Sequence, residues 1–282
     1  MQVKYYVGVD VSKNTLDICF LSSNKKDKSF YKIPNNQENI NSFFNSFKKD
    51  EIIVCFESTN NYHIELSKFL TKNKIVYSEL SSFKTSLFLK HLSHIKTDIT
   101  DSYGIAYYCA NFTNDIIASK YNSQYKLIKS YHSTYNLFVK MQTQIKNFEK
   151  SQISVNDEIL KDLIKELKLN LTKLLNKIEL ITYEILKKEI PQTEKIVNNN
   201  KGLGKNIAIT LFPVLYYSKD KNYKQIISYL GLSPRIYESG ISVKKNQHIN
   251  KIGNSNIRKA LFLSALSCIR FNPIFKNKIF YT

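Results

Sequence analysis

Four carboxylates in the first third of the chain are spaced as metal ligands could be. Asp10 and Glu57 each close a short apolar run, and Asp98 and Asp101 lie three residues apart where a helix is expected to begin. Side chains at i and i+3 share one face of a helix. Converging carboxylates repel one another, and two divalent ions, with Mg²⁺ as the usual hard ion, would offset that repulsion and support phosphoryl transfer. Each residue alone also fits a turn or a helix cap, so the hypothesis depends on their occurring together.

A serine in the last third of the chain is a candidate nucleophile. Ser239 precedes Gly240, which leaves room for a close ligand, although most Ser-Gly pairs are simply turns. A serine that attacks a phosphodiester needs positive charge nearby to stabilise the phosphate. The same region offers Arg235, Arg258, Lys244, Lys245 and Lys251 for contacts to nucleic acid.

The segment from Gly202 to Gly204 is a candidate contact to a DNA backbone. With an expected helix on each side it resembles a helix-hairpin-helix turn, in which backbone amides and the start of the next helix meet a phosphate. Lys205 opens that next helix. Glycine is also an ordinary helix C-cap, so the motif alone is a weak signal.

The distribution of charge favours a polyanionic partner for the last third. The chain has 42 basic and 23 acidic residues, a net charge of +19, yet residues 201–282 hold 14 of the basic and only two of the acidic ones. Such clustering is typical of nucleic-acid-binding modules. A composition rich in lysine, asparagine and isoleucine raises the net charge without any partner, so the clustering is the stronger observation.

The elements that would position the carboxylates have the order of a ribonuclease H-like domain. Alternation and β-branched residues predict strands at 4–10, 15–21, 29–33, 52–56 and 75–80, with helices after the third and fourth strands. In that fold the first and fourth strands are neighbours, which would bring Asp10 close to Glu57. Residues 8–13 also resemble the first phosphate loop of actin-like sugar kinases. With seven glycines in the chain and no second glycine-rich loop, the kinase hypothesis is poor.

Long helices are expected from 124 to 190, with a break near 151–156 and an end at Pro191. An apolar seam of period 3.5 in the second helix fits either packing within the chain or coiled-coil self-association. We therefore expect an α/β domain at 1–120, a helical coiled-coil region at 121–198 and a mainly helical domain at 199–282. The seam consists of Leu167, Leu171, Leu174, Ile178, Ile181 and Ile185.

Other features of the sequence are those of a soluble cytoplasmic protein. It is 43% hydrophobic, enough for a sizeable core, but no stretch reaches the roughly 18 apolar residues that cross a bilayer, and the start does not resemble a signal peptide. The four cysteines are far apart without a CxxC pair, so buried thiols are expected rather than zinc or disulfides.

Six motifs together resemble one family of proteins. In order along the chain they are GVDVSK, FEST, KTDxxD, GLG, YLGLSPRxYxSG and KxGNxxIRKAL. The chain is thereby similar to insertion-sequence transposases of the IS-one-ten type, the bridge-RNA-guided serine recombinases, over nearly its whole length.

The resemblance implies a RuvC-like DEDD domain, a coiled-coil connection and a C-terminal transposase domain. Carried over by position, Asp10, Glu57, Asp98 and Asp101 would hold Mg²⁺, and Ser239 would form a 5′-phosphoserine link to DNA. A structured noncoding RNA would guide DNA recognition. The active site would be assembled from two subunits of a dimer or tetramer, in a prokaryotic, nucleoid-associated setting.

Two alternatives remain open at this stage. The carboxylates could activate water in a RuvC-like, metal-dependent endonuclease. Relatives usually continue beyond the segment that here ends at Thr282, so the chain could also be a truncated nucleic-acid-binding remnant.

Overall fold

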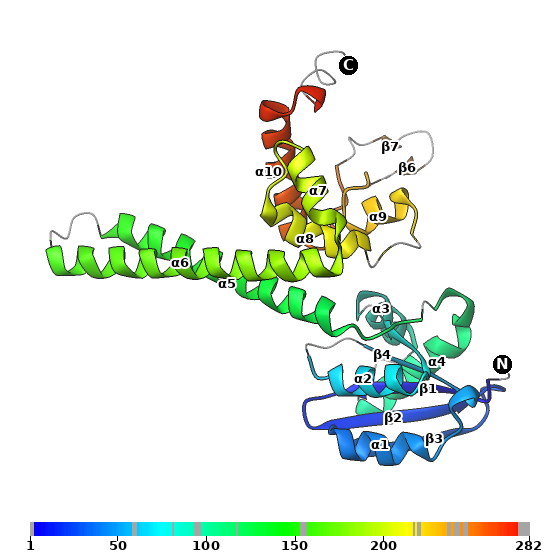
Figure 1. Cartoon of the computed structure of the whole chain (residues 1–282). Helices are drawn as coiled ribbons and strands as arrows, with labels where there is room; N and C mark the ends of the chain where they lie inside the picture. Colours follow the sequence, from blue (N-terminus) through cyan, green and yellow to red (C-terminus); the bar gives the residue numbers. More distant parts are fainter. Residues whose placement is uncertain are drawn as a thin grey trace. The chain divides into compact units, whose positions relative to one another are not determined.

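A computed structural model of the chain forms two compact units, Met1–Asn122 and Ser123–Thr282 (Figure 1). The structure describes residues 3–57, 61–80, 82–92, 97–116, 118–152, 157–216, 218, 221–235, 238–239, 243–244 and 248–275. Within these residues no helix is long and apolar enough to cross a membrane.

The first unit is built on a five-stranded sheet of order β3-β2-β1-β4-β5. Its first three strands form an antiparallel meander, while β4 runs parallel to β1 and β5 runs parallel to β4. The predicted strand order is thus confirmed, and it is consistent with a RuvC-like domain. The bounds are β1 Tyr5–Val11, β2 Thr15–Ser22, β3 Lys28–Pro34, β4 Ile52–Glu57 and β5 Val76–Leu80.

Alternation along the strands gives the sheet two different faces. One face, which includes Val7 and Val54, packs against α1 (Gln37–Asn45) and α2 (Ile64–Lys72). The other face includes Cys55 and packs against α4 (Asp98–Asn111), beside which lies α3 (Ser82–Leu92). Because side chains alternate with period two, Asp10 of β1 and Glu57 of β4 belong to the face that α4 covers.

Gly8 sets the distance between α4 and the sheet. A Cβ atom at Gly8 would lie 2.2 Å from the carbonyl oxygen of Ser102 and 2.3 Å from the amide nitrogen of Ala106. Both obstacles are backbone atoms of α4, so no side-chain rotation could make room. Only glycine allows this crossing, which holds the first turn of α4 at the end of β1 where Asp10 lies.

The second unit begins with two long antiparallel helices, α5 (Ser123–Ser151) and α6 (Glu158–Glu189). The side-chain amide of Gln142 donates to the hydroxyl of Thr172 at 3.1 Å, and Lys168 forms a 2.7 Å ion pair with Glu149. The later partner on α5 pairs with the earlier partner on α6, so the two helices are antiparallel.

The packing within the hairpin buries a seam other than the predicted one. The buried residues of α6 are Ile164, Leu171, Leu175, Thr182, Tyr183 and Leu186. Of the predicted seam Leu171 is buried, whereas Leu167 and Leu174 stay 48% and 45% exposed. The contacts within the chain therefore use one stripe of α6 and leave a second apolar stripe beside it.

Four shorter helices and a small strand pair complete the second unit. Ile128, Leu186, Ala208 and Phe212 belong to one core cluster that joins α5, α6 and α8. Helix α3 was not foreseen from the sequence, whereas α7 is the helix that was expected before the GLG turn. The remaining elements are α7 Gln192–Asn199, α8 Lys205–Tyr216, α9 Tyr223–Tyr229, β6 Glu238–Ser239, β7 Val243–Lys244 and α10 Ser255–Phe271.

We predict that Gly8→Ala destabilises the first unit by about 1–3 kcal/mol, because α4 must move off the sheet to admit the methyl group. Urea unfolding of the full chain would measure the loss. Gly204→Ala is the matched control, since no atom lies within 4 Å of its added Cβ. Equal stability of Gly8→Ala and the parent chain would contradict the account of the crossing.

Candidate active site

Asp10 lies in an acidic environment at the end of the sheet. Its pKa is raised to about 6, first by partial burial and then by the nearby carboxylates of Asp101, Asp98, Asp17 and Glu57, in that order. A carboxyl group with this pKa is ionised at neutral pH, where the neighbouring carboxylates repel its negative charge. The four predicted carboxylates therefore do influence one another in the fold.

The last residue of β4, Glu57, is held by a helix that the sequence pattern did not reveal. The buried hydroxyl of Thr85 in α3 donates a hydrogen bond to Oε1 of Glu57. A hydrogen bond to one carboxylate oxygen fixes the rotamer and leaves the other oxygen available. Thr85 is thus a positioning residue that sequence reasoning missed, because α3 has no clear apolar stripe.

Asp98 and Asp101 occupy the first turn of α4, as predicted. Thr97 and Thr100 form a capping box that fixes where the helix begins: the Thr97 hydroxyl accepts from the Thr100 amide, and the Thr100 hydroxyl accepts from the Thr97 amide. Carboxylates in a first turn are stabilised by the helix dipole. The side chain of Asp98 is 65% exposed and can reach a ligand in solvent.

A fifth carboxylate and a lysine also belong to this site. Asp17 of β2 pairs in register with Asp10 on one side and with Lys32 of β3 on the other. The ammonium of Lys32 lies 3.1 Å from Asp17 and 3.6 Å from Asp98. Asp17 is only 7% exposed, so it needs this counter-ion. An acidic residue inside the otherwise apolar run of β2 is the signal that could have identified it.

The donor set fits a hard divalent cation in its chemistry, because every predicted donor is a carboxylate oxygen. Among the described residues, however, no group of three acidic, histidine or cysteine side chains is close enough to hold one ion. Binding an ion would therefore require the side chains to draw together, and Lys32 would have to leave Asp98.

Ser239 lies on a short hairpin with a firmly paired base. In the hairpin Ser239 pairs with Val243, and Glu238 pairs with Lys244. Below it the amide of Arg235 donates to the carbonyl of His248, and the amide of Asn250 donates to that of Ser233, both at 2.9 Å. The side chains of Ser239 and Lys244 and the whole of Lys245 lie outside the described residues.

Three of the predicted nucleic-acid contacts have different surroundings. Arg235 and Lys251 are exposed. Arg258, in contrast, is half-buried and donates to the carbonyl of Leu230 at 3.2 Å, while its guanidinium lies against Gly231. Arg258 therefore joins α10 to the end of α9, whatever else it contacts.

The GLG turn lies between α7 and α8, with a helix on each side as expected. Gly202 has a left-handed φ of 102°, and an added Cβ would lie 2.6 Å from the backbone nitrogen of Cys268 in α10. Gly204 has open space, and the ammonium of Lys205 lies 5.5 Å from the ring centroid of Tyr183. Gly202 thus serves the packing of the turn on α10, whereas the Gly204 end is open to a ligand.

Two family models match the chain. The transposase IS116/IS110/IS902 family matches residues 194–279, and a second model, a transposase of the DEDD type from IS110 elements, matches residues 7–175. Similar curated proteins include the pilin gene-inverting proteins of Moraxella bovis and Moraxella lacunata, which are 24% and 26% identical over 276 residues. Each of these alignments covers 93% of this chain and 82% of the relative.

We predict that Asp10→Asn stabilises the chain above pH 6 when divalent ions are removed with EDTA. Because the pKa of Asp10 is raised from 3.8 to about 6 by folding, folding stability falls as pH rises from about 4 to about 6 and stays lower above that range. Since the group is partly exposed, solvent screening limits the gain to about 1–2 kcal/mol. Urea unfolding between pH 4 and pH 8 would show the advantage shrinking toward pH 4.

Asp27→Asn is the control for this experiment, because Asp27 is an exposed aspartate of the same unit. An advantage of Asp10→Asn that is the same at every pH would point to packing rather than charge and would contradict the prediction.

Proposed function

Because the chain belongs to the IS110 family of DEDD transposases, it is an enzyme of DNA transposition or inversion, and we propose that it cuts and rejoins DNA through Ser239. The observation that supports this assignment most is the joint presence of a carboxylate cluster in the first unit and a serine hairpin in the second. The first unit would act as the RuvC-like domain, and the last third of the chain, which follows the long helices in sequence, would act as the transposase domain.

The DEDD type of the first domain indicates a divalent metal ion, and we infer Mg²⁺ held by Asp10, Glu57, Asp98 and Asp101. Such ions would polarise the scissile phosphate and stabilise charge on the departing oxygen. Thr85 and the Thr97–Thr100 capping box would keep Glu57 and the two α4 carboxylates oriented toward them. The excess negative charge at Asp10 supports this assignment, because a cation would relieve it.

The proposed covalent step is a transesterification. The Ser239 hydroxyl loses its proton and attacks phosphorus, the bond from phosphorus to the 3′ oxygen breaks, and that oxygen leaves as a 3′ hydroxyl after taking up a proton. The DNA end is then held as a 5′-phosphoserine. A 3′ hydroxyl of another strand attacks this ester in the reverse sense and releases the serine, so no energy source is needed.

Rejoining favours serine chemistry over hydrolysis. The names of the Moraxella relatives say that they invert a pilin gene, and inversion of a DNA segment requires that broken ends be joined again. A water-activating endonuclease would leave free ends. A phosphoserine conserves the bond energy until the new partner arrives, which supports the recombinase over the nuclease.

Recognition by a guide RNA and self-association are further parts of the proposal. When a guide RNA recognises the DNA sequence by base pairing, protein side chains need to recognise little of it. The last third of the chain, with 14 basic and two acidic residues, would then bind mainly the phosphate backbone. The exposed apolar side chains of the helical hairpin offer a surface for a second copy, in a dimer or tetramer. They include Leu137, Met141, Phe148, Leu163, Leu167 and Leu174.

We predict a covalent protein–DNA adduct when the purified chain is incubated with Mg²⁺ and the two ends of its element. Denaturing gels with 5′- and 3′-labelled DNA would show protein on the 5′ phosphate. Ser239→Ala should abolish the adduct, and Asp98→Asn should reduce it at least about 100-fold, the scale on which loss of electrostatic stabilisation acts.

Ser228→Ala is the control, because Ser228 is an exposed serine of α9 in the same basic region. An adduct that survives Ser239→Ala would remove that residue from the mechanism. Cleaved DNA without protein, formed at equal rates by the parent and Ser239→Ala, would instead establish the endonuclease.

We also predict that one discrete noncoding RNA copurifies with the chain when it is expressed together with its native flanking DNA. Sequencing of the bound RNA would identify it and the DNA with which it pairs. Heterogeneous RNA in a preparation that still cleaves its DNA would refute RNA guidance without affecting the assignment of Ser239.

A further inference from the structure

The second unit contains a cavity of about 390 Å³ that the proposed strand chemistry does not use. It is lined by one face of α5, by α8, by Tyr229 of α9 and by the start of α10. We call it the α5–α10 cavity. Its volume falls in the range of small-molecule sites.

The floor of the α5–α10 cavity is apolar and fixed. Ile128, Ile209, Pro213 and Ile257 line it and are all buried. Such a floor suits a flat, weakly polar group and offers nothing to a solvated ion alone.

One polar group of the wall is held in a defined state. The Thr210 hydroxyl donates to the carbonyl of Asn206 at 2.7 Å, so at the 3.1 Å contact it accepts from Nε2 of His132. The side-chain amide nitrogen of Asn136 lies 3.3 Å from Nε2 and 3.5 Å from Nδ1 of the same ring. Burial lowers the pKa of His132, which favours the neutral ring.

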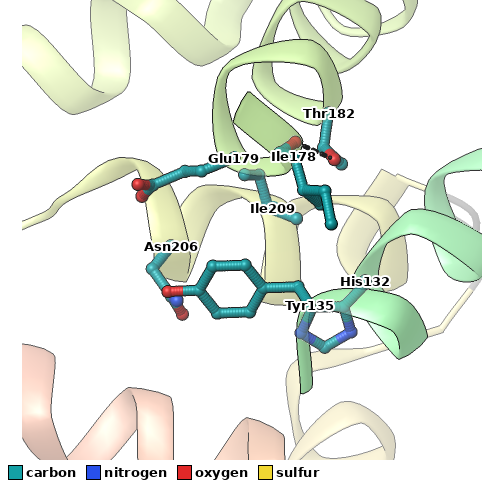
Figure 2. Close-up of a pocket in the computed structure, with 7 residues that line it drawn as sticks. All are labelled: His132, Tyr135, Ile178, Glu179, Thr182, Asn206 and Ile209. Atoms are coloured by element: carbon teal, nitrogen blue, oxygen red, sulfur yellow. Dashed lines mark hydrogen bonds between the residues drawn. The ribbon is translucent and has the colours of Figure 1, made fainter. Parts of the chain in front are cut away.

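His132 also lines a second, much smaller cavity. Figure 2 shows the ring beside Tyr135, near Ile178 and Thr182 of α6 and Ile209 of α8, around a cavity of only about 10 Å³. That space holds a water molecule at most. The α5–α10 cavity is therefore the larger of the two spaces that His132 lines, and the one with room for a ligand.

The rim of the α5–α10 cavity is positive and rich in donors. Lys129 and Lys140 lie eleven residues apart, about 16 Å along α5, and the described lining residues include no acidic one. Asn254 caps the 17-residue helix α10, whose first turn also has no acidic residue. Lysines and a helix start at one rim suit negatively charged oxygens.

Two tyrosines border the same space. Tyr125 is half-buried on α5, and Tyr229 is 56% exposed. Aromatic rings combined with lysines are how proteins hold single-stranded nucleic acid, with bases stacked on the rings and phosphates on the charges.

We propose that the α5–α10 cavity binds one unstacked nucleotide of a single-stranded nucleic acid, with its base over the apolar floor and the flanking phosphates at Lys129 and Lys140. The proposal rests on the nucleic-acid function argued above, but not on the serine chemistry. The distance between the two lysines favours a strand that crosses the cavity over a free mononucleotide. The lining residues fit the bases and phosphates that DNA and RNA share, and the experiment distinguishes a DNA strand from an RNA strand.

The test is binding of fluorescein-labelled dT12 and U12 to the full chain, measured by fluorescence anisotropy over a range of salt concentrations. Lys129→Gln/Lys140→Gln should weaken binding at least about tenfold and lower the slope of log Kd against log salt by about 1.4, since two phosphate contacts are lost. The control is Lys146→Gln/Lys150→Gln, two exposed lysines of the same helix outside the cavity, which should stay within about threefold of the parent.

The base contact is tested separately. Tyr229→Leu should weaken binding of dT12 several-fold and leave binding of a dodecamer of abasic spacers unchanged, and 5-iodouracil crosslinks should map to Tyr125 or Tyr229. Tighter binding of U12 than of dT12 would assign the strand to RNA, and the reverse to DNA.

Equal losses in the two lysine pairs, or no loss in either, would overturn the proposal, because binding would then be diffuse or elsewhere. These assays measure binding to single strands, whereas the adduct assay measures covalent attachment of protein to DNA. The failure of the phosphoserine mechanism and the failure of this cavity are therefore seen in different measurements.

Discussion

The close crossing of α4 over β1 is the contact on which the candidate site depends. Gly8 has no side chain, and the backbone of α4 at Ser102 and Ala106 fills the space that a Cβ would need. Both carboxylates are close in sequence to this contact. Asp10 follows Gly8 by two residues on the strand, and Asp101 directly precedes Ser102 on the helix. The absence of one methyl group thus lets Asp10 and Asp101, which are 91 residues apart in sequence, lie within electrostatic reach, consistent with the raised pKa of Asp10.

The two units handle charge in opposite ways. The first gathers acidic groups at one end of a sheet and compensates them with Lys32. The second presents lysines and helix starts, with its only two acidic residues after position 200 at Asp220 and Glu238. Phosphodiester chemistry needs both kinds of surface, cations at the reacting phosphate and a positive track for the rest of the strand. The division into two units separates these requirements physically.

Much of the first unit could be predicted because its signals are local. Alternation identified all five strands, and the i, i+3 spacing placed Asp98 and Asp101 on the first turn of a helix. Asp17 and Lys32 were missed because their importance arises from pairing across strands, which a single strand does not reveal. Helix α3, and with it Thr85, was missed because its apolar residues do not form one stripe. In α6 the period of the seam was right, but Leu167 and Leu174 are exposed, since periodicity alone does not say which of two adjacent stripes meets α5.

The contact of Lys32 with Asp17 and Asp98 would make uptake of a metal ion at the proposed site an exchange of cations. The ammonium of Lys32 already lies near Asp98, so a divalent ion that binds Asp98 displaces a tethered monovalent one rather than entering vacant space. Release of Lys32 leaves Asp17 buried beside Asp10 with less compensation, a cost that the incoming ion must offset. Strand β3, which carries none of the proposed ligands, would therefore also influence affinity for a metal ion through Lys32.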